Sequence, residues 1–490
     1  MRRALALLCI SVCTFAQDEP VFRSGTRLVQ VDVVVRTKKG AIGGLTKDQF
    51  KLFDNGKPQV ISTFVAPPER GKAEPLPPGA VSNRLTPTGE PPSTVTVILV
   101  DHMNTTIDLQ PYMHKQVEQL AQRRSKDRLA IMVLTDAELR VVHDFTDPPE
   151  HLVAVMKDMT PERWVRPFSG SRRDLYTTFQ NLQVTTTSAM QEIARHLANV
   201  PGRKNLIWIS GSFPMFMNNR TVQMDFTAEI AHALQPLSDA NVAVYPVDAR
   251  GLISGVAALD QPAPVARRGR GAPVTVTEPP ALNTLNYVAE QTGGKAYYNT
   301  NGIADSVEDA IHDSDQVYTL GFYPAEGTQD DAFHKLRVRV DVKGADVRAR
   351  PGYLASKTAA TQARQTPQDL LRASLDSTAI GLLAQVVSVD GGQIQLQLSA
   401  DLNDVFLQSK DGTRSGALDV LISDGATISS LAVPIQKTEA EYREALSKPF
   451  GLTWKIPITT NGNQVRELRI IVQDHTTGAA GSVRLPVTKP

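Results

Sequence analysis

The chain has 490 residues, of which 41% are hydrophobic and 21% are charged. Its 52 Lys and Arg residues nearly balance its 51 Asp and Glu residues, which argues against nucleic acid or a polybasic membrane contact as the main partner. A chain of this length exceeds one ordinary domain, and we expect two or three.

Residues 1–16 have the pattern of a secretory signal peptide. The pattern has three parts, which are a basic start, an apolar stretch over residues 4–12 and a small-x-small sequence ending at Ala16. The apolar stretch is about half of the roughly 20 residues that a transmembrane helix needs. A lipoprotein cleaved before Cys13 is the alternative. We expect an exported protein (periplasmic, cell-surface or secreted) with no transmembrane segment after cleavage and, since Cys9 and Cys13 both lie in the signal, no thiol chemistry.

Residues 17–66 are predicted to form a short β-rich region. Residues 28–37 alternate apolar and polar side chains at first, and Asn55 and Gly56 separate two β-rich stretches as in a hairpin. About 50 residues make a marginal domain on their own. Residues 67–92 contain eight prolines and almost no large apolar side chain, which predicts a linker.

Residues 93–316 alternate predicted strands with predicted helices. This alternation predicts a doubly wound, mostly parallel sheet of the Rossmann type. A basic Gly- and Pro-rich stretch at residues 255–280 is interpreted as a surface loop rather than a contact arm. The predicted strands are 95–100, 128–134, 140–144, 205–209, 241–247 and 295–298, and the predicted helices are 111–124, 148–159, 174–197 with a break near 184–187, 227–240, 282–292 and 303–314.

Two further β regions follow. Residues 317–355 are too few to bury a core alone, so we expect them to complete one β-sandwich with residues 17–66, with the α/β domain inserted between the halves. A polar linker spans residues 356–367. Residues 368–490 hold a helix and then strands at about 10-residue spacing, which is typical of a β-sandwich. The predicted fold class is therefore α/β plus all-β.

The strand predicted at residues 95–100 ends at Asp101. A carboxylate at the carboxyl end of a buried parallel strand lies where open α/β sheets bind their ligands. Residues 210–217 follow the strand at 205–209 and should lie on the same edge. Within them, Phe213, Met215 and Phe216 are interpreted either as core beneath the loop or as an apolar contact for a partner.

Several ordered motifs carry a family resemblance. They are V-D-V-V-V-R-T, L-T-K-D-Q-F-K-L-F-D-N-G-K-P-Q, I-L-V-D-H-M-N-T, P-G-R-K-N-L-I-W-I-S-G-S-F-P, A-N-V-A-V-Y-P-V-D-A-R-G-L, Y-T-L-G-F-Y-P and R-P-G-Y. The α/β block resembles a von Willebrand factor A (VWA) domain, and residues 29–355 together resemble the acidobacterial VWFA-related family. The last 115 or so residues carry no such resemblance.

The resemblance implies a site for a divalent cation, Mg²⁺ or Ca²⁺, formed by Asp-x-Ser-x-Ser, a Thr from a second loop and an Asp from a third. Asp101 and Thr105 match the first motif, whereas Met103 replaces its middle serine. Ser169 or Ser171 is nearest to the second-loop position. The third-loop Asp is absent, because Ser210, Gly211 and Ser212 follow the strand. The alternative is that Asp101 caps the following turn or bonds Ser210 or Ser212.

No zinc-protease motif, nucleophile elbow, phosphate loop or dinucleotide-binding motif is present. We therefore predict a non-enzymatic interaction protein whose protein partner contacts a rim at the carboxyl edge of the sheet. The alternatives are an envelope assembly component with an inert rim and a secreted hydrolase of unrecognised type. The predicted rim residues are Asn104, Ser210, Ser212, Phe213, Met215 and Phe216.

Overall fold

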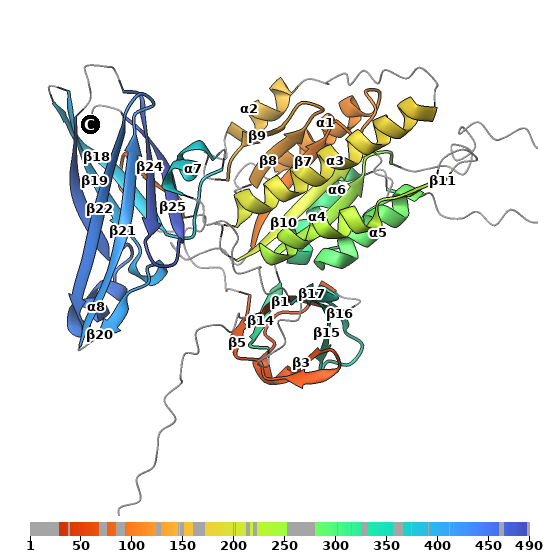
Figure 1. The fold of residues 1–490 in the computed structure, drawn as a ribbon, viewed down its shortest axis with the longest axis horizontal. Helices are drawn as coiled ribbons and strands as arrows, with labels where there is room; N and C mark the ends of the chain where they lie inside the picture. Colours follow the sequence, from red (N-terminus) through yellow and green to blue (C-terminus); the bar gives the residue numbers. More distant parts are fainter. Residues whose placement is uncertain are drawn as a thin grey trace, which may run out of the picture.

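The computed structural model describes the chain from residue 29 to residue 487 in segments. The parts outside the description are 1–28, 38–39, 68–75, 85–93, 124–128, 146, 148–150, 160–171, 199, 201, 212–215, 219–222, 252–279, 301, 315, 325–331, 356–365, 374, 391, 411, 460–464 and 488–490. The predicted signal peptide and the basic loop therefore lie outside the described residues. Figure 1 shows an α/β body, a small β body below it and a larger C-terminal β body beside it.

The small β body contains two sheets, with strand orders β16-β1-β14-β5 and β17-β15-β3-β4. Antiparallel pairing of Val29 in β1 with Phe322 in β14 joins segments from before and after the α/β body. Asn55 and Gly56 have positive φ angles of 47° and 80°, as a tight hairpin between β3 and β4 requires. The strands are β1 (Val29–Thr37), β2 (Gly40–Ala41), β3 (Phe50–Asp54), β4 (Lys57–Gln59), β5 (Thr63–Val65), β14 (Val317–Phe322), β15 (Phe333–Val340), β16 (Asp346–Arg348) and β17 (Gly352–Leu354).

The α/β body is organised around a five-stranded sheet of order β13-β10-β7-β8-β9. The neighbours from β13 to β8 are parallel, and β9 runs antiparallel to β8. The other sheets formed by the described strands are antiparallel. The strands of this body are β7 (Thr94–Asp101), β8 (Leu129–Leu134), β9 (Leu139–His143), β10 (Arg203–Ser210), β11 (Phe216–Asn218), β12 (Gln223–Asp225) and β13 (Val242–Asp248).

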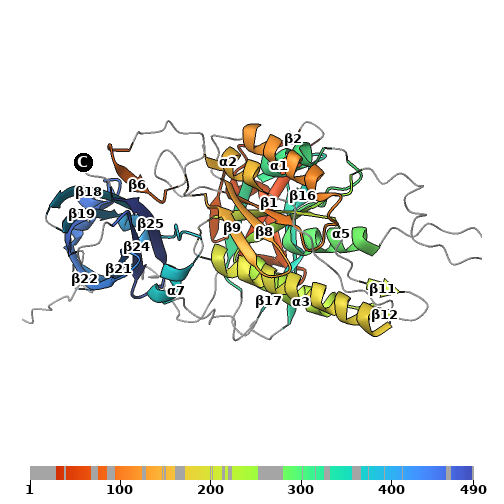
Figure 2. The same ribbon diagram turned by 90° about the horizontal axis from the view of Figure 1, so that it is seen from above.

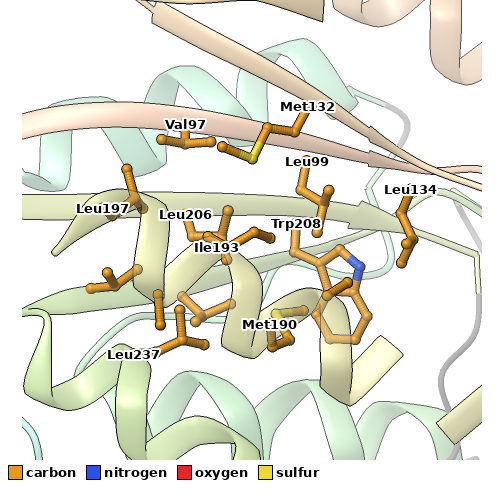
Figure 3. Packing of buried hydrophobic residues seen from close by; sticks show 14 of the residues in the cluster. Val97, Leu99, Met132, Leu134, Met190, Ile193, Leu197, Leu206, Trp208 and Leu237 are labelled. Carbon is orange, nitrogen blue, oxygen red and sulfur yellow. The ribbon is translucent and has the colours of Figure 1, made fainter. Parts of the chain in front are cut away.

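Helices cover both faces of this sheet (Figure 2). Because side chains alternate along a strand, Val97 and Leu99 pack under α3, α4 and α5, while Ile98 and Val100 pack under α1, α2 and α6. Figure 3 shows the first of these cores, with Trp208 at one end. The helices are α1 (Gln110–Arg123), α2 (His151–Asp158), α3 (Arg172–Leu197), α4 (Thr227–Asp239), α5 (Pro280–Thr292) and α6 (Ile303–Ser314).

Two local predictions for this body are wrong. Helix α3 continues through residues 184–187, where the Thr187 hydroxyl donates to the carbonyls of Gln183 (2.8 Å) and Val184 (3.1 Å) and so has its hydrogen bonds within the helix. The strand predicted at residues 295–298 is reduced to one bridge between Tyr297 and Val247. No helix in the described parts of the chain is both long and apolar enough to span a bilayer.

The C-terminal β body contains sheets of order β23-β19-β18-β6 and β20-β21-β24-β25, with β22 on β21. Strand β6 comes from the Pro-rich segment predicted to be a linker, some 300 residues before its partner β18. The elements are β6 (Ala80–Ser82), α7 (Pro367–Arg372), β18 (Leu382–Asp390), β19 (Gln393–Ala400), β20 (Gln408–Lys410), β21 (Thr413–Ser423), β22 (Ile428–Thr438), α8 (Glu439–Leu446), β23 (Leu452–Thr459), β24 (Glu467–Asp474) and β25 (Ala480–Pro486).

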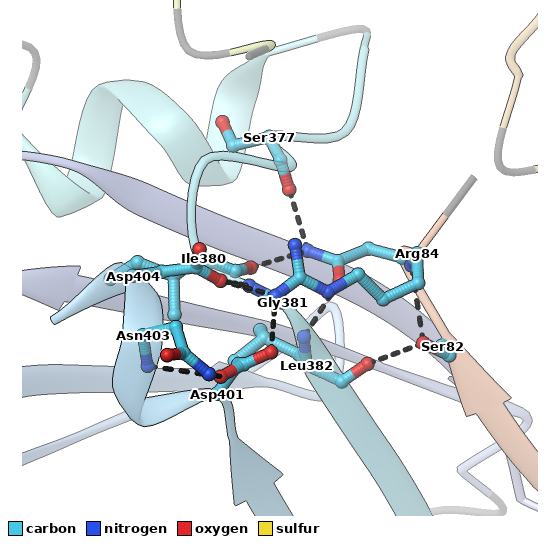
Figure 4. Close-up of polar contacts among 10 residues, drawn as sticks. Ser82, Arg84, Ser377, Ile380, Gly381, Leu382, Asp401, Asn403 and Asp404 are labelled. Atoms are coloured by element: carbon cyan, nitrogen blue, oxygen red, sulfur yellow. Dashed lines mark hydrogen bonds and ion pairs between the residues drawn. The ribbon is translucent and has the colours of Figure 1, made fainter. Parts of the chain in front are cut away.

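Polar side chains fix β6 to this body. The buried Asn83 amide donates to the carbonyls of Ser377 (2.8 Å) and Ile380 (2.9 Å), and its oxygen accepts from Leu382 N (2.7 Å). The Arg84 guanidinium lies between two carboxylates, Asp401 and Asp404 (Figure 4). Residues 76–84 therefore belong structurally to the C-terminal body, which corrects the prediction that all of residues 67–92 form a linker.

Buried charges join the α/β body to the C-terminal body. Asp144, just after β9, accepts a hydrogen bond from Asp376 N at 2.7 Å, and Arg484 Nη1 lies 3.8 Å from both carboxylates. Ser482 also donates to Asp376, at 2.8 Å. Burial, together with the nearby charge of Asp376, raises the pKa of Asp144 to about 7. This contact between the bodies therefore contains a carboxyl group that titrates near neutral pH.

Candidate functional site

Three polar residues end parallel strands on one edge of the central sheet. β7 ends at Asp101, β10 at Ser210 and β13 at Asp248, and Ser210 is in register with Asp248. Carboxyl ends of parallel strands meet at one edge, which is where ligands bind in open α/β sheets. The structure thus brings Asp101 and Ser210 to the same edge.

Asp101 is completely buried, and both of its oxygens accept hydrogen bonds from protein donors. Oδ1 accepts from the backbone N–H of Asn104 at 2.9 Å, so the side chain caps the turn that follows β7. Oδ2 accepts from Asn104 Nδ2 and from the indole Nε1 of Trp208, each at 2.9 Å. Asn104 Nδ2 also donates to Thr186 of α3 at 3.0 Å.

Two opposing effects act on the Asp101 carboxyl. Burial raises its pKa and is the larger effect, while the hydrogen bonds from Asn104 and Trp208 lower the pKa by stabilising the ionised form. The Ser210 hydroxyl lowers the pKa of Asp101 less than Asn104 and Trp208 do. This hydroxyl is buried and has no partner within hydrogen-bond distance. Asp101 is therefore held as an internal structural group.

The loop after β7 is packed against the end of β10. The backbone N–H of Gly211 donates to Thr105 Oγ1 at 2.9 Å. A Cβ atom at Gly211 would lie 3.1 Å from the Thr105 Cα and 3.2 Å from the Asn104 carbonyl oxygen. The family pattern has its third-loop Asp at this position. A side chain at this position would require the backbone of Asn104 and Thr105 to shift by a few tenths of an ångström, and glycine avoids that shift.

Met103 and Gln110 hold the loop after β7 in place, the first by core packing and the second by hydrogen bonds. Met103 is buried and packs in the core under α3, so it occupies the position of the middle serine as a core residue. The Gln110 amide, at the start of α1, donates to the carbonyls of His102 (3.3 Å) and Thr105 (3.1 Å). The first half of the loop is therefore fixed by internal contacts.

The described donor set does not fit Mg²⁺ or Ca²⁺. These ions bind oxygen lone pairs, whereas N–H groups already point at both Asp101 oxygens and at Thr105 Oγ1. The described segments contain no group of three or more His, Asp or Glu side chains placed to hold a metal. These hydrogen bonds favour the alternative prediction, in which Asp101 caps the turn that follows β7, and the metal site at Asp101 and Thr105 stays a prediction. Ser169 and Ser171 lie outside the described residues.

Most of the predicted rim does not reach the surface or is not described. Asn104 and Ser210 are buried, so neither can form the predicted partner contact. Ser212, Phe213 and Met215 lie outside the described residues. Phe216 is the first residue of β11, which forms a two-stranded ribbon with β12.

The exposed part of this edge starts at Thr106, two residues after the predicted rim residue Asn104. Thr106, Ile107 and Asp108 follow the buried loop and face solvent, with the Ile107 side chain 40% exposed. Asp136 and Glu138 are exposed in the turn between β8 and β9, at the same edge. None of these residues was among those predicted from the sequence to form the rim. The sequence feature that could have indicated an exposed apolar side chain is Ile107 itself, an isoleucine between polar residues in a segment that has neither helical nor strand periodicity.

Asp248 and His102 are also engaged internally. Asp248 Oδ1 accepts from Arg250 Nε at 2.9 Å and its Oδ2 lies 2.7 Å from Arg250 Nη2, so this carboxylate fixes its own loop. The Nε2 atoms of His102 and His114 are 2.6 Å apart, so one ring donates to the other. Burial, with His114 and Arg140 adding, lowers the pKa of His102 to about 4. His102 is therefore neutral and does not bond Asp101.

Comparisons with known proteins add little to this description. No protein-family model and no curated protein matches the chain. Similar solved structures include an aerotolerance-related membrane protein from Bacteroides fragilis (13% identity, TM-score 0.27) and BatB from Bacteroides thetaiotaomicron (12%, 0.27), each matching 45% of this chain and 98% of its own. The SpRpn10 VWA domain matches 45% of this chain and 96% of its own, at 12% identity and a TM-score of 0.24. These values are too low to assign ancestry or function.

Proposed function

We propose that the chain is an exported, non-enzymatic protein that binds another protein through the exposed carboxyl edge of its parallel strands. In this proposal, residues 93–316 form a doubly wound domain of the VWA type. The observation that supports the proposal most directly is the exposure of Ile107 beside a metal-site motif whose oxygens are bonded internally. The binding contact then depends on side-chain shape and charge and needs no bridging cation.

The chemistry of the edge indicates what kind of partner fits. Ile107 is an exposed apolar side chain next to the exposed Asp108, and the exposed Asp136 and Glu138 lie at the same edge of the sheet, in the turn after β8. Interfaces commonly combine a central apolar anchor with a polar border. The matching partner surface would be an apolar pocket bordered by Lys or Arg side chains.

The test is affinity capture from an envelope extract with matched single substitutions. Ile107→Asp is expected to reduce capture of the partner at least tenfold, because it places a charge in the apolar centre of the contact. Val60→Asp is the control, since Val60 is 82% exposed on the small β body. Equal capture by the parent and by Ile107→Asp would refute the proposal.

The same experiment addresses the alternative that the C-terminal body carries the contacts. Leu431 is 46% exposed on strand β22 of that body. If Leu431→Asp abolishes capture while Ile107→Asp binds normally, the partner binds the C-terminal body and the edge of the α/β body is inert.

A metal titration tests the proposed absence of a bridging cation. Thermal unfolding is followed with Mg²⁺, Ca²⁺ and Mn²⁺ at up to millimolar concentration, and no stabilisation is expected. A site occupied at 100 times its Kd would add about 2.7 kcal/mol to the free energy of unfolding. A gain of that size, lost in Asp101→Asn, would contradict the proposal for the metal while leaving protein binding open to the capture test.

A further inference from the structure

Strand β22 forms one edge of a sheet in the C-terminal body (Figure 1). Among the described strands it pairs with β21 alone, and all 11 of its residues are in a continuous antiparallel register with that strand. An edge strand presents a row of backbone N–H and C=O groups on its outer side that another strand can pair with. The outer side of β22 has no strand partner within the described segments.

The first half of β22 is uncovered on both faces of the sheet. Residues 428–432 are all exposed. Leu431 points to the same side as the buried core residues Val433 and Ile435, because side chains alternate along a strand. Leu431 is nevertheless 46% exposed, so the opposite sheet does not cover this part of the strand. On the other face, Ile428 is 60% exposed.

This half of β22 also lacks the features that usually protect an edge strand. Lysine, proline and β-bulges are the common means of preventing edge-to-edge pairing. Strand β23, an edge of the opposite sheet, contains Lys455 and Pro457. Residues 428–433 of β22, I-S-S-L-A-V, contain no charge and no proline, and their register with β21 has no bulge. We call residues 428–433 the open stretch, which ends where Pro434 begins.

The charges that flank the open stretch favour a second copy of the chain as the added strand. Asp424 precedes β22 and Lys437 lies near its end, with no charged residue between them. An antiparallel copy places Lys437 beside the partner's Asp424, whereas a parallel copy places like charges side by side. If the two-fold axis passes through Ser430 or Leu431, Lys437 lies opposite a residue adjacent to the partner's Asp424. Opposite charges across paired strands are stabilising.

We propose that two copies of the chain pair through the open stretch of β22, antiparallel and about a two-fold axis. The two sheets then continue into one another through backbone hydrogen bonds, as in other cases of strand addition. A two-fold contact uses the same surface on both copies and therefore closes at the dimer. The paired stretch is short compared with stable interfaces, so the dimer is weak and its population depends on concentration. This inference does not depend on the proposed binding of another protein at Ile107.

The first experiment measures the mass of the purified full chain by sedimentation equilibrium, from about 1 to about 200 µM, with no other protein present. The weight-average mass is expected to rise with concentration towards twice the monomer mass. Ser430→Lys places two ammonium groups close together near the axis and should weaken the dimer Kd at least tenfold. Ser415→Lys is the matched control, because Ser415 is an exposed serine on the inner strand β21, and it should leave the Kd within twofold.

Disulfide formation then locates the axis, in a chain whose two cysteines, Cys9 and Cys13, are replaced by serine. Directly opposed residues of antiparallel strands have Cα atoms about 4.5–5.5 Å apart, which suits a disulfide. Mild oxidation should give a covalent dimer with Ser430→Cys or with Leu431→Cys, depending on the residue at the axis, and none with Ser415→Cys.

Four results would overturn the inference. They are a monomer at every concentration, an equal loss of dimer in Ser430→Lys and Ser415→Lys, no covalent dimer from either cysteine variant of β22, and masses that keep rising beyond twice the monomer. The last result indicates head-to-tail pairing of β22 with a different edge, since such contacts do not close.

Discussion

Replacing Asp101 with alanine separates a structural role from a metal-binding role. The substitution removes the acceptor for three buried donors, which are the Asn104 N–H, Asn104 Nδ2 and Trp208 Nε1. Asn104 Nδ2 keeps the Thr186 hydroxyl as an acceptor, so two donors are left with none. At about 1–3 kcal/mol for each unsatisfied buried group, the free energy of unfolding should fall by about 2–6 kcal/mol.

The assay is urea unfolding followed by circular dichroism in buffer with and without chelator. Asp108→Ala is the matched control, because it removes an exposed carboxylate seven residues further on and should change stability by less than about 0.5 kcal/mol. A structural role predicts the same large loss for Asp101→Ala in both buffers. A loss below about 1 kcal/mol with chelator, together with a large loss in Mg²⁺, would refute this reasoning.

Three further outcomes follow from the contacts described above. Burial raises the pKa of Asp144 in the folded state to about 7. Its contribution to the free energy of unfolding is therefore full below about pH 4 and is lost as pH rises through 7. The melting temperature should fall between about pH 5.5 and about pH 8.5 in the parent, and it should fall less in Asp144→Asn. Gly211→Asp restores the carboxylate of the family pattern but crowds Thr105, so urea unfolding should show a loss of about 1–3 kcal/mol and calorimetry no gain in Mg²⁺ binding. Asn83→Ala removes three buried hydrogen bonds, and limited proteolysis should then cleave residues 76–84 faster than in the parent, whereas unchanged cleavage would contradict their attachment to the C-terminal body.

The central strands were predictable because a strand buried on both faces has a continuous run of apolar, β-branched residues, and these runs can be recognised in the sequence. Strand β7 spans Thr94–Asp101 against a prediction of 95–100, and β13 spans Val242–Asp248 against 241–247. The hairpin at Asn55 and Gly56 was predictable for a different reason, since few residues adopt positive φ. Both the apolar runs of the strands and the positive φ angles of the hairpin turn depend on residues that are close in sequence.

The candidate site was less predictable because its contacts join distant residues. Nothing near Asp101 in the sequence indicates that Trp208, 107 residues away, donates to it, or that Thr186 reaches Asn104 from the middle of α3. The family pattern identified the loop correctly as the end of β7. It could not show that these residues point inward, so the exposed segment beginning at Thr106 was missed.

Strand β6 has a consequence for how the chain folds during synthesis. Ser82 and Leu382 lie 300 residues apart, and the α/β body is translated between them. The ribosome therefore releases β6 long before its partner exists, and the segment stays unpaired while the α/β body and the small β body form. Closing so long a loop carries an entropic cost that favours late, slow pairing. Assembly of the C-terminal body should accordingly be the last step, and a chain truncated before residue 382 would leave β6 as an open strand available to other chains.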